Sequence, residues 1–427
     1  MGRLDHARAI VAEVACHLKA DCSVELWNGE RLPLGRGARD DIRIRIGSPA
    51  AIGRLVRSPK LVTLVEVYLS GDLDIVGASP LDALQRWDHL DAVNLKRRVD
   101  RMLVLRHALP FLTARAPAEP GMRFRDRVRR VAGRGRDDQA MVQFHYDLSN
   151  AFYALFLGPT MQYSSAVFDA FDTNLDSAQT AKLDLICRKL RLRPGSKLLD
   201  IGCGWGGLAA HAAERFGATV HGVTLSAAQL EAARTLIVER GLEDRVTLEL
   251  RDYREIEAAG EYDAVAQIGM FEHVGIDNHD RFFEQMACLL KPGGLYLHQA
   301  TTRRAIRDLS KFRRRTAYME VINRWIFPGG ELDHLGLTAT NLERWGFEIR
   351  DVESMREHYH LTLKAWSERL YANRDAAAKE VGVTRVRLWL LYLALSCTGF
   401  QRGVLCDFQT LAQKRVTGLS GLPLRRE

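Results

Sequence analysis

The sequence predicts an α/β protein in which a small α+β domain precedes a larger domain built on a parallel sheet with helices on both faces. The chain has 427 residues, which is too long for one ordinary hydrophobic core. From residue 197 onward, short apolar runs alternate with helical patterns, as they do in parallel sheets. A glycine-rich turn separates the first such run from the helical segment that follows it, which is typical of the opening unit of these sheets.

The N-terminal part mixes helical and strand patterns. Apolar residues recur at helical spacing over 3–19, and an Asn28-Gly29 turn joins the short runs 24–27 and 30–32 into a hairpin. We therefore predict a domain over 1–116, a basic linker over 117–139 and a catalytic domain over 140–427. The further elements predicted before the linker are a strand at 42–46 and helices at 49–57, 59–69 and 80–110.

The second domain contains the regular alternation. Its parallel strands and their crossover helices place ligands beyond the carboxyl ends of the strands. The predicted strands are 197–201, 219–225, 245–251, 262–268 and 294–300, and the predicted helices are 207–216, 226–240 and 278–290.

The first strand of this domain ends in an acid. Asp200 comes two residues before Gly202, and Gly202 and Gly204 permit positive φ and close approach of a ligand to the backbone. A carboxylate here would repel a pyrophosphate, whereas it suits the sulfonium and ammonium of S-adenosylmethionine. The run Leu-Asp-Ile-Gly-Cys-Gly resembles the first motif of class I methyltransferases. An Asp that merely caps the turn is the simpler alternative.

Polar residues follow the next two strands. Thr224 and Gln229 stand where many adenosine sites have an acid for the ribose, and Ser226 equally fits the N-cap of the next helix. Asp252 and Tyr253 follow the third strand and are placed to contact adenine.

Composition limits the partners and the compartment. The net charge is +8, with basic clusters at 123–136 and 303–315 that fit an anionic membrane surface or a nucleic acid. Seven scattered cysteines form no Cys-x-x-Cys pair, so we expect neither a metal site nor a disulfide framework. The run 388–400 is too short to span a bilayer, and no signal peptide is recognisable. We expect a cytoplasmic protein.

Five motifs in one order then give a specific resemblance. The sequence resembles the cyclopropane-fatty-acyl-phospholipid synthases and their mycolic-acid relatives over roughly residues 140–415, and its N-terminal domain also looks like that of the bacterial phospholipid enzymes. The motifs are Tyr146-Asp147-Leu148-Ser149-Asn150, Met161-Gln162-Tyr163-Ser164-Ser165, the glycine turn, Gly269-Met270-Phe271-Glu272-His273-Val274-Gly275 and Ile326-Phe327-Pro328-Gly329-Gly330.

The resemblance implies a chemistry and a site. The alkene of an unsaturated acyl chain attacks the methyl group of S-adenosylmethionine, and a bound bicarbonate removes a proton from the resulting cation so that a cyclopropane ring closes. Glu272, His298 and Tyr359 would hold the bicarbonate together with the loop at Ser164 and Ser165. The cofactor positions are Tyr163, Ser164, Gly202, Gly204, Thr224, Gln229, Asp252 and Tyr253, with Asp200 beside them.

Aromatic rings are expected to stabilise the cation and to keep water out. The candidates are Tyr163, Phe168, Phe271 and Trp325.

Three departures from the family pattern leave the product open. Ser165 replaces a cysteine, Gln299-Ala300 replaces Thr-Ile after His298, and Ser396 aligns with a later cysteine. Ala300 would enlarge a pocket that a β-branched residue fills. Loss of a different proton from the same cation would give a methyl-branched or methylene-bearing chain in place of a ring.

The substrate expected from the resemblance is a membrane phospholipid with an unsaturated acyl chain. We expect peripheral binding at the inner face of the membrane, with the apolar residues of 316–330 either in the core or at a membrane-facing mouth beside the basic cluster 303–315. The resemblance is compatible with a homodimer to which the N-terminal domain contributes. A basic nucleic-acid methyltransferase is a different-class alternative, but no motif of that class is present, so no nucleic acid is expected. A lipid-binding protein without catalysis is the third alternative.

Overall fold

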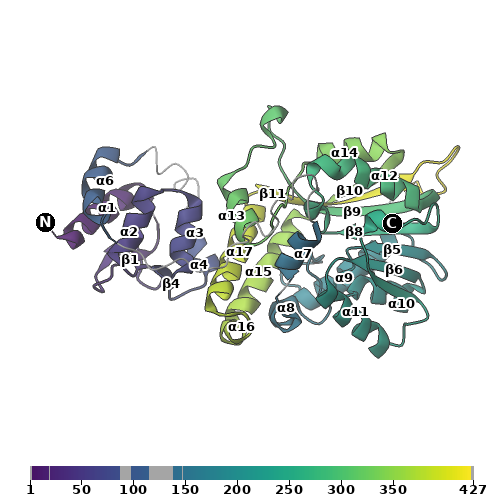
Figure 1. Cartoon of the computed structure of the whole chain (residues 1–427), viewed down its shortest axis with the longest axis horizontal. Coiled ribbons are helices and arrows are strands. Elements are labelled where there is room, and N and C mark those ends of the chain that lie inside the picture. The colour runs from purple at the N-terminus through teal and green to yellow at the C-terminus, as the bar shows by residue number, and fades with distance from the viewer. Residues whose placement is uncertain (1, 19, 87–97, 115–137, 147, 425–427) are drawn as a thin grey trace. The chain divides into compact units, whose positions relative to one another are not determined.

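The computed structural model describes residues 2–18, 20–86, 98–114, 138–146 and 148–424 (Figure 1). Most of the predicted linker and its basic cluster at 123–136 lie outside these residues. The chain forms two compact units, and neither is continuous in sequence. The first unit comprises 1–123, 315–325 and 367–398, and the second comprises 124–314, 326–366 and 399–427.

The first unit contains a four-stranded sheet in the order β2-β1-β3-β4. The predicted hairpin is confirmed, because β1 (Ser23–Glu25) pairs antiparallel with β2 (Arg31–Pro33). The predicted strand at 42–46 is β3 (Arg43–Ile46), which runs parallel to β1. The short strand β4 (Leu73–Val76) was not predicted, because its four residues carry Asp74 and show no alternation of burial.

Three helices of this unit match the predictions: α1 (Arg3–Leu18), α2 (Pro49–Arg57) and α3 (Leu61–Leu69). The single helix predicted over 80–110 is wrong. α4 (Pro80–Leu84) is short, and a separate helix α6 (Arg101–Ala108) begins where the Asp100 carboxylate accepts hydrogen bonds from two backbone amides. Residues 87–97 between them lie outside the described ranges. A one-turn helix η1 (Leu109–Phe111) follows α6.

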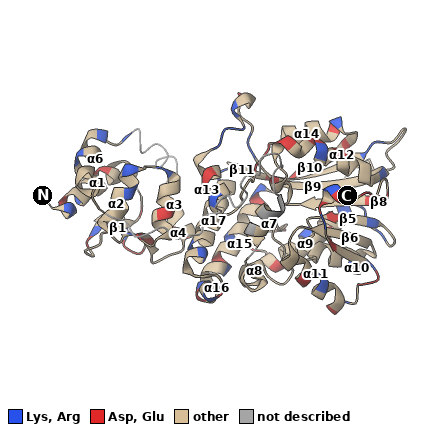
Figure 2. Cartoon of the chain, viewed as in Figure 1, with Lys and Arg blue, Asp and Glu red and all other residues tan. Residues whose placement is uncertain are grey.

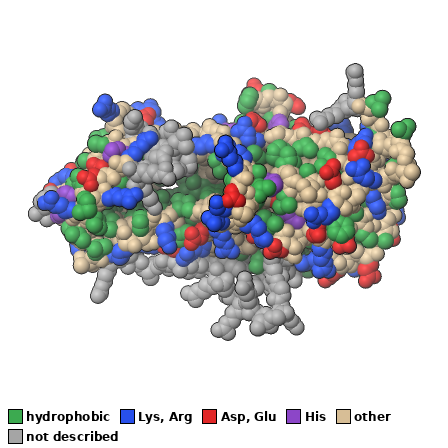
Figure 3. Space-filling view, turned by 90° about the horizontal axis from the view of Figure 1, so that it is seen from above, with side chains coloured by type: hydrophobic (Ala, Val, Ile, Leu, Met, Phe, Trp, Pro, Cys, Tyr) green, Lys and Arg blue, Asp and Glu red, His purple; other side chains and the backbone are tan. Residues whose placement is uncertain are grey.

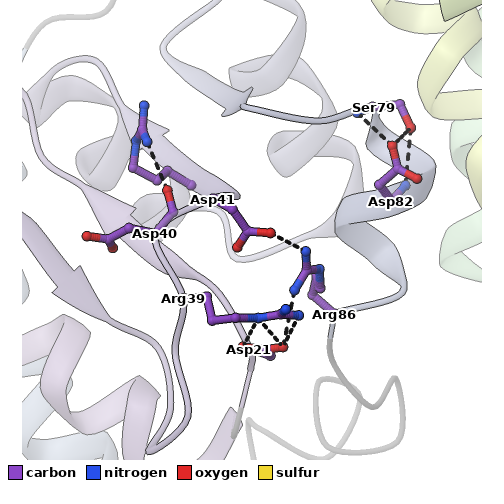
Figure 4. Close-up of polar contacts among 8 residues, drawn as sticks. Asp21, Arg39, Asp40, Asp41, Ser79, Asp82 and Arg86 are labelled. Atoms are coloured by element: carbon purple, nitrogen blue, oxygen red, sulfur yellow. Dashed lines mark hydrogen bonds and ion pairs between the residues drawn. The ribbon is translucent and has the colours of Figure 1, made fainter.

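Polar contacts hold α4 against the sheet (Figure 4). Ser79 and Asp82 form a reciprocal capping box at its first turn. Arg86, which follows the helix, donates to Asp21 at 3.2 Å and also pairs with Asp41. These contacts connect α4 to the residues before β1 and β3.

Late segments of the chain belong to the same unit. Arg324 on α13 (Ala317–Trp325) pairs with Glu66 at 3.0 Å. Arg387 on α17 (Val383–Gln401) donates to Asp74 at 2.7 Å, and its guanidinium lies over the ring of Tyr68. Long-range ion pairs therefore attach residues from the C-terminal third to the N-terminal fold.

The second unit is a seven-stranded sheet in the order β10-β11-β9-β8-β5-β6-β7 (Figure 1). Its parallel strands match the five predicted ones: β5 (Lys197–Ile201), β6 (Thr219–Thr224), β7 (Val246–Leu250), β8 (Tyr262–Ile268) and β9 (Leu290–Arg303). A wholly parallel sheet is nevertheless the wrong description. β11 (Leu405–Lys414) pairs antiparallel with β9, and β10 (Phe347–Ser354) pairs antiparallel with β11.

Helices cover both faces of this sheet. Leu198 of β5 packs with apolar residues of one face and Leu199 with those of the other, as the alternation of a buried strand requires. α9 (Leu175–Lys189), α10 (Gly207–Phe216) and α11 (Ala227–Glu239) supply the first face. α12 (His279–Leu289) and α14 (Leu335–Arg344) supply the second.

The other elements of the second unit are α7 (Asp138–Tyr146), α8 (Asn150–Leu157), η2 (Tyr253–Glu255), η3 (Phe271–His273), η4 (Ile276–Asn278) and η5 (Leu309–Lys311). α15 (Arg356–Ala372) has residues in both units, and α16 (Arg374–Val381) belongs to the first. Among the described residues, no helix combines the length and the apolar character that crossing a bilayer requires.

Candidate active site

One cavity of about 1090 Å³, including the solvent at its mouth, lies at the carboxyl ends of β5, β6, β7 and β8. All nine residues predicted to bind the cofactor line it: Tyr163, Ser164, Asp200, Gly202, Gly204, Thr224, Gln229, Asp252 and Tyr253. These residues come from four separate stretches of sequence. The order of the parallel strands brings them together, as expected at the switch point of such a sheet.

The turn after β5 has the backbone that the glycines permit. Gly202 has φ of +80° and Gly204 has φ of +54°. A Cβ atom at Gly202 would lie 3.0 Å from the side chain of Met270, so a larger residue would both strain the turn and press on the opposite wall.

A buried acid and a buried base form the floor of the cavity. Asp200 is 3% exposed, and its Oδ2 atom has no hydrogen-bond partner among the described residues. The Nζ atom of Lys182, on α9, donates to Gln162 at 2.6 Å and to Ser164 at 3.3 Å. Burial raises the pKa of Asp200 to about 7 and lowers the pKa of Lys182 to about 7, while the charge of each opposes the shift of the other.

The walls beyond β6 and β7 are prepositioned by local hydrogen bonds. Thr224 donates to Gln229 at 3.2 Å, and Ser226 caps α11 by accepting from the amide of Gln229, so the capping interpretation of Ser226 is confirmed. Asp252 accepts from the backbone and the guanidinium of Arg254. Its carboxylate is therefore held in place before any ligand arrives.

Aromatic rings form another wall. Tyr146, Tyr163 and Trp205 line the cavity, and the ring of Tyr146 meets both Tyr163 and Trp205 edge to face with centroids 6.3 and 6.2 Å apart. His145 stacks on Tyr163, and its Nδ1–H group donates to the carbonyl of Ile326 at 3.0 Å. Ring faces of this kind favour a cationic ligand.

None of the four catalytic candidates Glu272, His298, Tyr359 and Ser165 lines this cavity, among the residues that the structure describes. Glu272 lies on η3, between Phe271 and His273. Its Oε1 atom accepts from the amide of Thr301 at 2.7 Å, while Oε2 is buried without a partner. Burial raises the pKa of this carboxyl group.

His298 lies on β9 inside an aromatic cluster. Its ring meets that of Phe271 edge to face at 4.5 Å, and its Nδ1 atom lies 2.9 Å from the hydroxyl of Tyr296. Burial lowers the pKa of His298 to about 3, so the imidazole is neutral. Burial also keeps Tyr296 protonated, and the Nε2 atom of His298 is buried without a partner among the described residues.

The other two candidates have different surroundings. The Ser165 hydroxyl is fully buried and donates to the carbonyl of Ala166 at 3.1 Å. Tyr359, on α15, packs against Phe400 with ring centroids 4.6 Å apart. Neither contact is with Glu272 or His298.

The structure places several other residues of the sequence analysis. Ala300 packs in the hydrophobic core that contains Phe271 and does not line the cofactor cavity. Phe271 is likewise a core residue, and Phe168 stacks on His358. Trp325 is buried in the first unit, outside the cavity lining.

Reasoning from sequence missed four lining residues of chemical interest: Lys182, Trp205, Tyr146 and His273. Tyr146 and His273 belong to motifs of the family resemblance, and Trp205 belongs to the glycine turn, so the sequence already indicated that these three lie near the site. Nothing in the sequence indicated Lys182, because one lysine in an amphipathic helix ordinarily faces solvent.

The fold and the site define a class I methyltransferase. Residues 134–410 match the mycolic acid cyclopropane synthetase family. The chain is 36% identical over 405 residues to a probable fatty acid methyltransferase from Pseudomonas putida, with 95% of each chain covered. It is 38% identical over 256 residues to the cyclopropane-fatty-acyl-phospholipid synthase of Escherichia coli strain K12, covering 60% of this chain and 62% of that one.

Two solved structures extend the comparison. A cyclopropane synthase from Mycobacterium tuberculosis aligns with a TM-score of 0.61 and 31% identity, over 65% of this chain and 98% of that one. A mycolic acid cyclopropane synthase complexed with SAH and CTAB aligns with a TM-score of 0.60 and 33% identity, over the same shares. The chain therefore belongs to the mycolic acid cyclopropane synthetase family of S-adenosylmethionine-dependent methyltransferases.

Replacing Lys182 with Met tests the floor of the cavity. The change leaves Gln162 and Ser164 without their donor and removes the positive charge near Asp200. We expect the free energy of unfolding in urea to fall by about 3 kcal/mol, because a buried charge loses its compensation. Lys197→Met, at an exposed lysine at the start of β5 in the same unit, is the matched control. Equal stability of the two variants would contradict this account.

Proposed function

We propose that this protein transfers the methyl carbon of S-adenosylmethionine to the double bond of an unsaturated fatty acyl chain in a membrane phospholipid and forms a cyclopropane ring. The observation that carries the proposal is the single cavity lined by all nine predicted cofactor residues, with the carboxyl group of Asp200 in its floor. When bound, S-adenosylmethionine supplies an electrophilic methyl group.

The cavity suits a cation better than a phosphate. Asp200 offers a buried oxygen without a partner, and Tyr146, Tyr163 and Trp205 offer ring faces or edges around it. The nearby Lys182 is engaged by Gln162 and Ser164, so it fixes the loop rather than presenting a charge to the ligand. These residues bind and orient a sulfonium compound.

The names and ligands of the relatives support an acyl substrate. The similar proteins include a fatty acid methyltransferase and a cyclopropane-fatty-acyl-phospholipid synthase. A solved relative holds CTAB, a detergent that joins a long alkyl chain to a cationic head. An alkyl chain beside a positive charge resembles the carbocation that forms within the acyl chain when its double bond is methylated.

The residues around Glu272 suit the bicarbonate that the family resemblance implies. Glu272 has one buried oxygen that can accept a proton, and His298 has a neutral ring whose Nε2 atom can donate in the Nε2–H tautomer. A buried anion needs such donors. Bicarbonate supplies the base when bound, and Glu272, His298 and Tyr359, with the loop at Ser165, would hold it.

A branching methyltransferase is the second candidate. It is favoured by the relative with 95% coverage, which carries the name fatty acid methyltransferase. Because Ala300 and Phe271 pack in the core, a difference in product would arise from how Glu272 and the 163–165 loop direct proton loss.

Association with an anionic membrane is assigned to the segment 303–315. Figure 2 shows its Lys and Arg positions in blue, and on the face drawn in Figure 3 basic side chains are interspersed with apolar ones. Ile306 and Leu309 are exposed among them. By contrast, Val321, Trp325 and Ile326 are buried, so the expectation of a membrane-facing mouth over 316–330 is replaced by the core alternative for these three.

The affinity for S-adenosylmethionine should rise with pH. Below about 7, Asp200 takes up a proton and loses its attraction for the sulfonium. This follows from the raised pKa of Asp200. We expect Kd from calorimetry to fall about fivefold from pH 6 to 7 and about twofold more above pH 7, where ionisation of Asp200 is completed. In Asp200→Asn this dependence should flatten. Parallel profiles for the two proteins would exclude Asp200 as the cation partner.

Lipid analysis tests the reaction and the role of Glu272. In a host that lacks such an enzyme, the wild-type chain should add one carbon to unsaturated fatty acids with a cyclopropane fragmentation pattern by mass spectrometry. Glu272→Gln should lower turnover by about 10² to 10⁴ while keeping cofactor affinity, because only proton removal is impaired. Glu261→Gln, at an exposed glutamate, is the control. A one-carbon gain without a ring would favour branching, and no new lipid would overturn the substrate class.

Vesicle binding tests the basic segment. Replacing Arg304 and Arg307 with Gln should weaken binding to phosphatidylglycerol vesicles about thirtyfold, at about 1 kcal/mol for each arginine. Replacing Arg188 and Arg193, which are exposed elsewhere in the same unit, removes the same charge and should leave binding unchanged. Equal loss in both pairs would show that net charge alone drives association.

A further inference from the structure

A chain of buried amide side chains connects two neighbouring strands of the second unit, β11 and β9. The Nζ atom of Lys189, at the end of α9, donates to Gln409 Oε1 at 2.8 Å. Gln409 Nε2 donates to Gln299 Oε1 at 3.0 Å, and Gln299 Nε2 donates to Asp407 Oδ2 at 2.7 Å. Gln409, Gln299 and Asp407 are at most 2% exposed, so no solvent competes for these hydrogen bonds.

The direction of this chain is determined at Lys189. An ammonium group only donates, so Gln409 must present its oxygen to Lys189 and its NH₂ group to Gln299. Gln299 must then present its own NH₂ group to Asp407. The ion pairs of Lys189 with Glu353 at 2.5 Å and Asp351 at 3.7 Å keep the ammonium in place. Asp407 is thus held as an acceptor at the far end.

The same chain reaches Glu272 through Thr301. The amide of Thr301 donates to Glu272 Oε1 at 2.7 Å, and Thr301 on β9 pairs directly with Asp407 on β11 in the antiparallel ladder. The side chains of two residues paired in this way lie on the same face of the sheet, with Cβ atoms about 5 Å apart. The proton state of Asp407 therefore bears directly on Glu272.

The charges around this pair come from several elements. Burial, with a contribution from Glu272, raises the pKa of Asp407 to about 7. The same two causes raise the pKa of Asp333, just before α14, to about 7. Burial and the Glu272 carboxyl group also raise the pKa of Tyr146 on α7. The buried carboxyl groups of Glu272 and Asp333 disfavour a further negative charge on Asp407. A hydrogen-bond donor to Asp407 therefore has a large influence on the ionisation of Asp407.

We propose that Gln299 and Asp407 are positioning residues for Glu272: the amide chain from Lys189 stabilises the negative charge of Asp407, and this charge together with Thr301 orients and polarises the Glu272 carboxyl group. The proposal rests on the proposed role of Glu272 in catalysis.

The experiment combines an infrared titration with a pH profile. In Gln299→Leu, Asp407 loses its donor, so the pH midpoint of its carboxylic-acid C=O band, identified by its absence in Asp407→Asn, should rise by about one unit. With Asp407 protonated, Glu272 loses a neighbouring negative charge. The acid limb of the kcat/KM profile should therefore move about one unit lower in both variants, because Glu272 ionises more readily.

Gln267→Leu is the matched control. Gln267 is fully buried on β8 and donates only to the backbone carbonyl of Gln299, so its removal perturbs the same region without touching the amide chain. Both readouts should stay at their wild-type values. Lys189→Met should reproduce the shift of Gln299→Leu in direction, and the double variant should shift no further than Gln299→Leu alone.

The outcomes separate this proposal from the proposed function. An infrared shift in Gln299→Leu, with no activity of any variant on any lipid, supports the amide chain and overturns the function. Unchanged infrared midpoints in Gln299→Leu overturn the amide chain whatever the activity. Equal shifts in Gln299→Leu and Gln267→Leu also overturn it, because they would reflect general loosening of the core.

Discussion

The structure depends on burying β5 between two parallel neighbours. Lys197–Ile201 pairs with β6 on one side and β8 on the other, so both faces and both edges of this strand are inside the protein. The acid at its end, Asp200, is buried with it. A buried carboxyl group is tolerated only with compensation, and here the compensation comes from the electrostatic influence of Lys182. The cavity, the glycine turn and the 162–164 loop are all arranged around this carboxyl group.

Burial of ionisable groups recurs in the second unit. Asp200, Asp333 and Asp407 all have pKa values raised to about 7, and that of Glu272 is raised as well. Each such group costs stability, so a fold that retains several of them gains something else. At Asp200 the proposed gain is a cation site, and around Glu272 it is a set of carboxyl groups with pKa values close to neutral pH.

The family and the packing together separate two questions about the reaction. The residues proposed to bind the cofactor converge on one cavity, and seven of the nine lie at the ends of β5, β6 and β7 or just after them. The residues proposed to remove the proton, Glu272 and His298, lie outside that lining and are hydrogen-bonded to the core of the sheet through Thr301 and Tyr296. Under the proposed function, the choice between a ring and a branched chain depends on this second group.

The sequence by itself determined the parallel strands, the turn at Gly202 and the set of cofactor residues, because strand periodicity and glycine positions are local properties. Only the tertiary structure decided how segments distant in sequence come together. The antiparallel strands β10 and β11, the placement of α13 and α17 in the first unit, the burial of Lys182 and the amide chain from Lys189 to Asp407 all depend on contacts between residues far apart in sequence. No local pattern encodes such contacts, because the sequence around a single lysine or glutamine does not show whether its side chain faces water or a buried carboxylate.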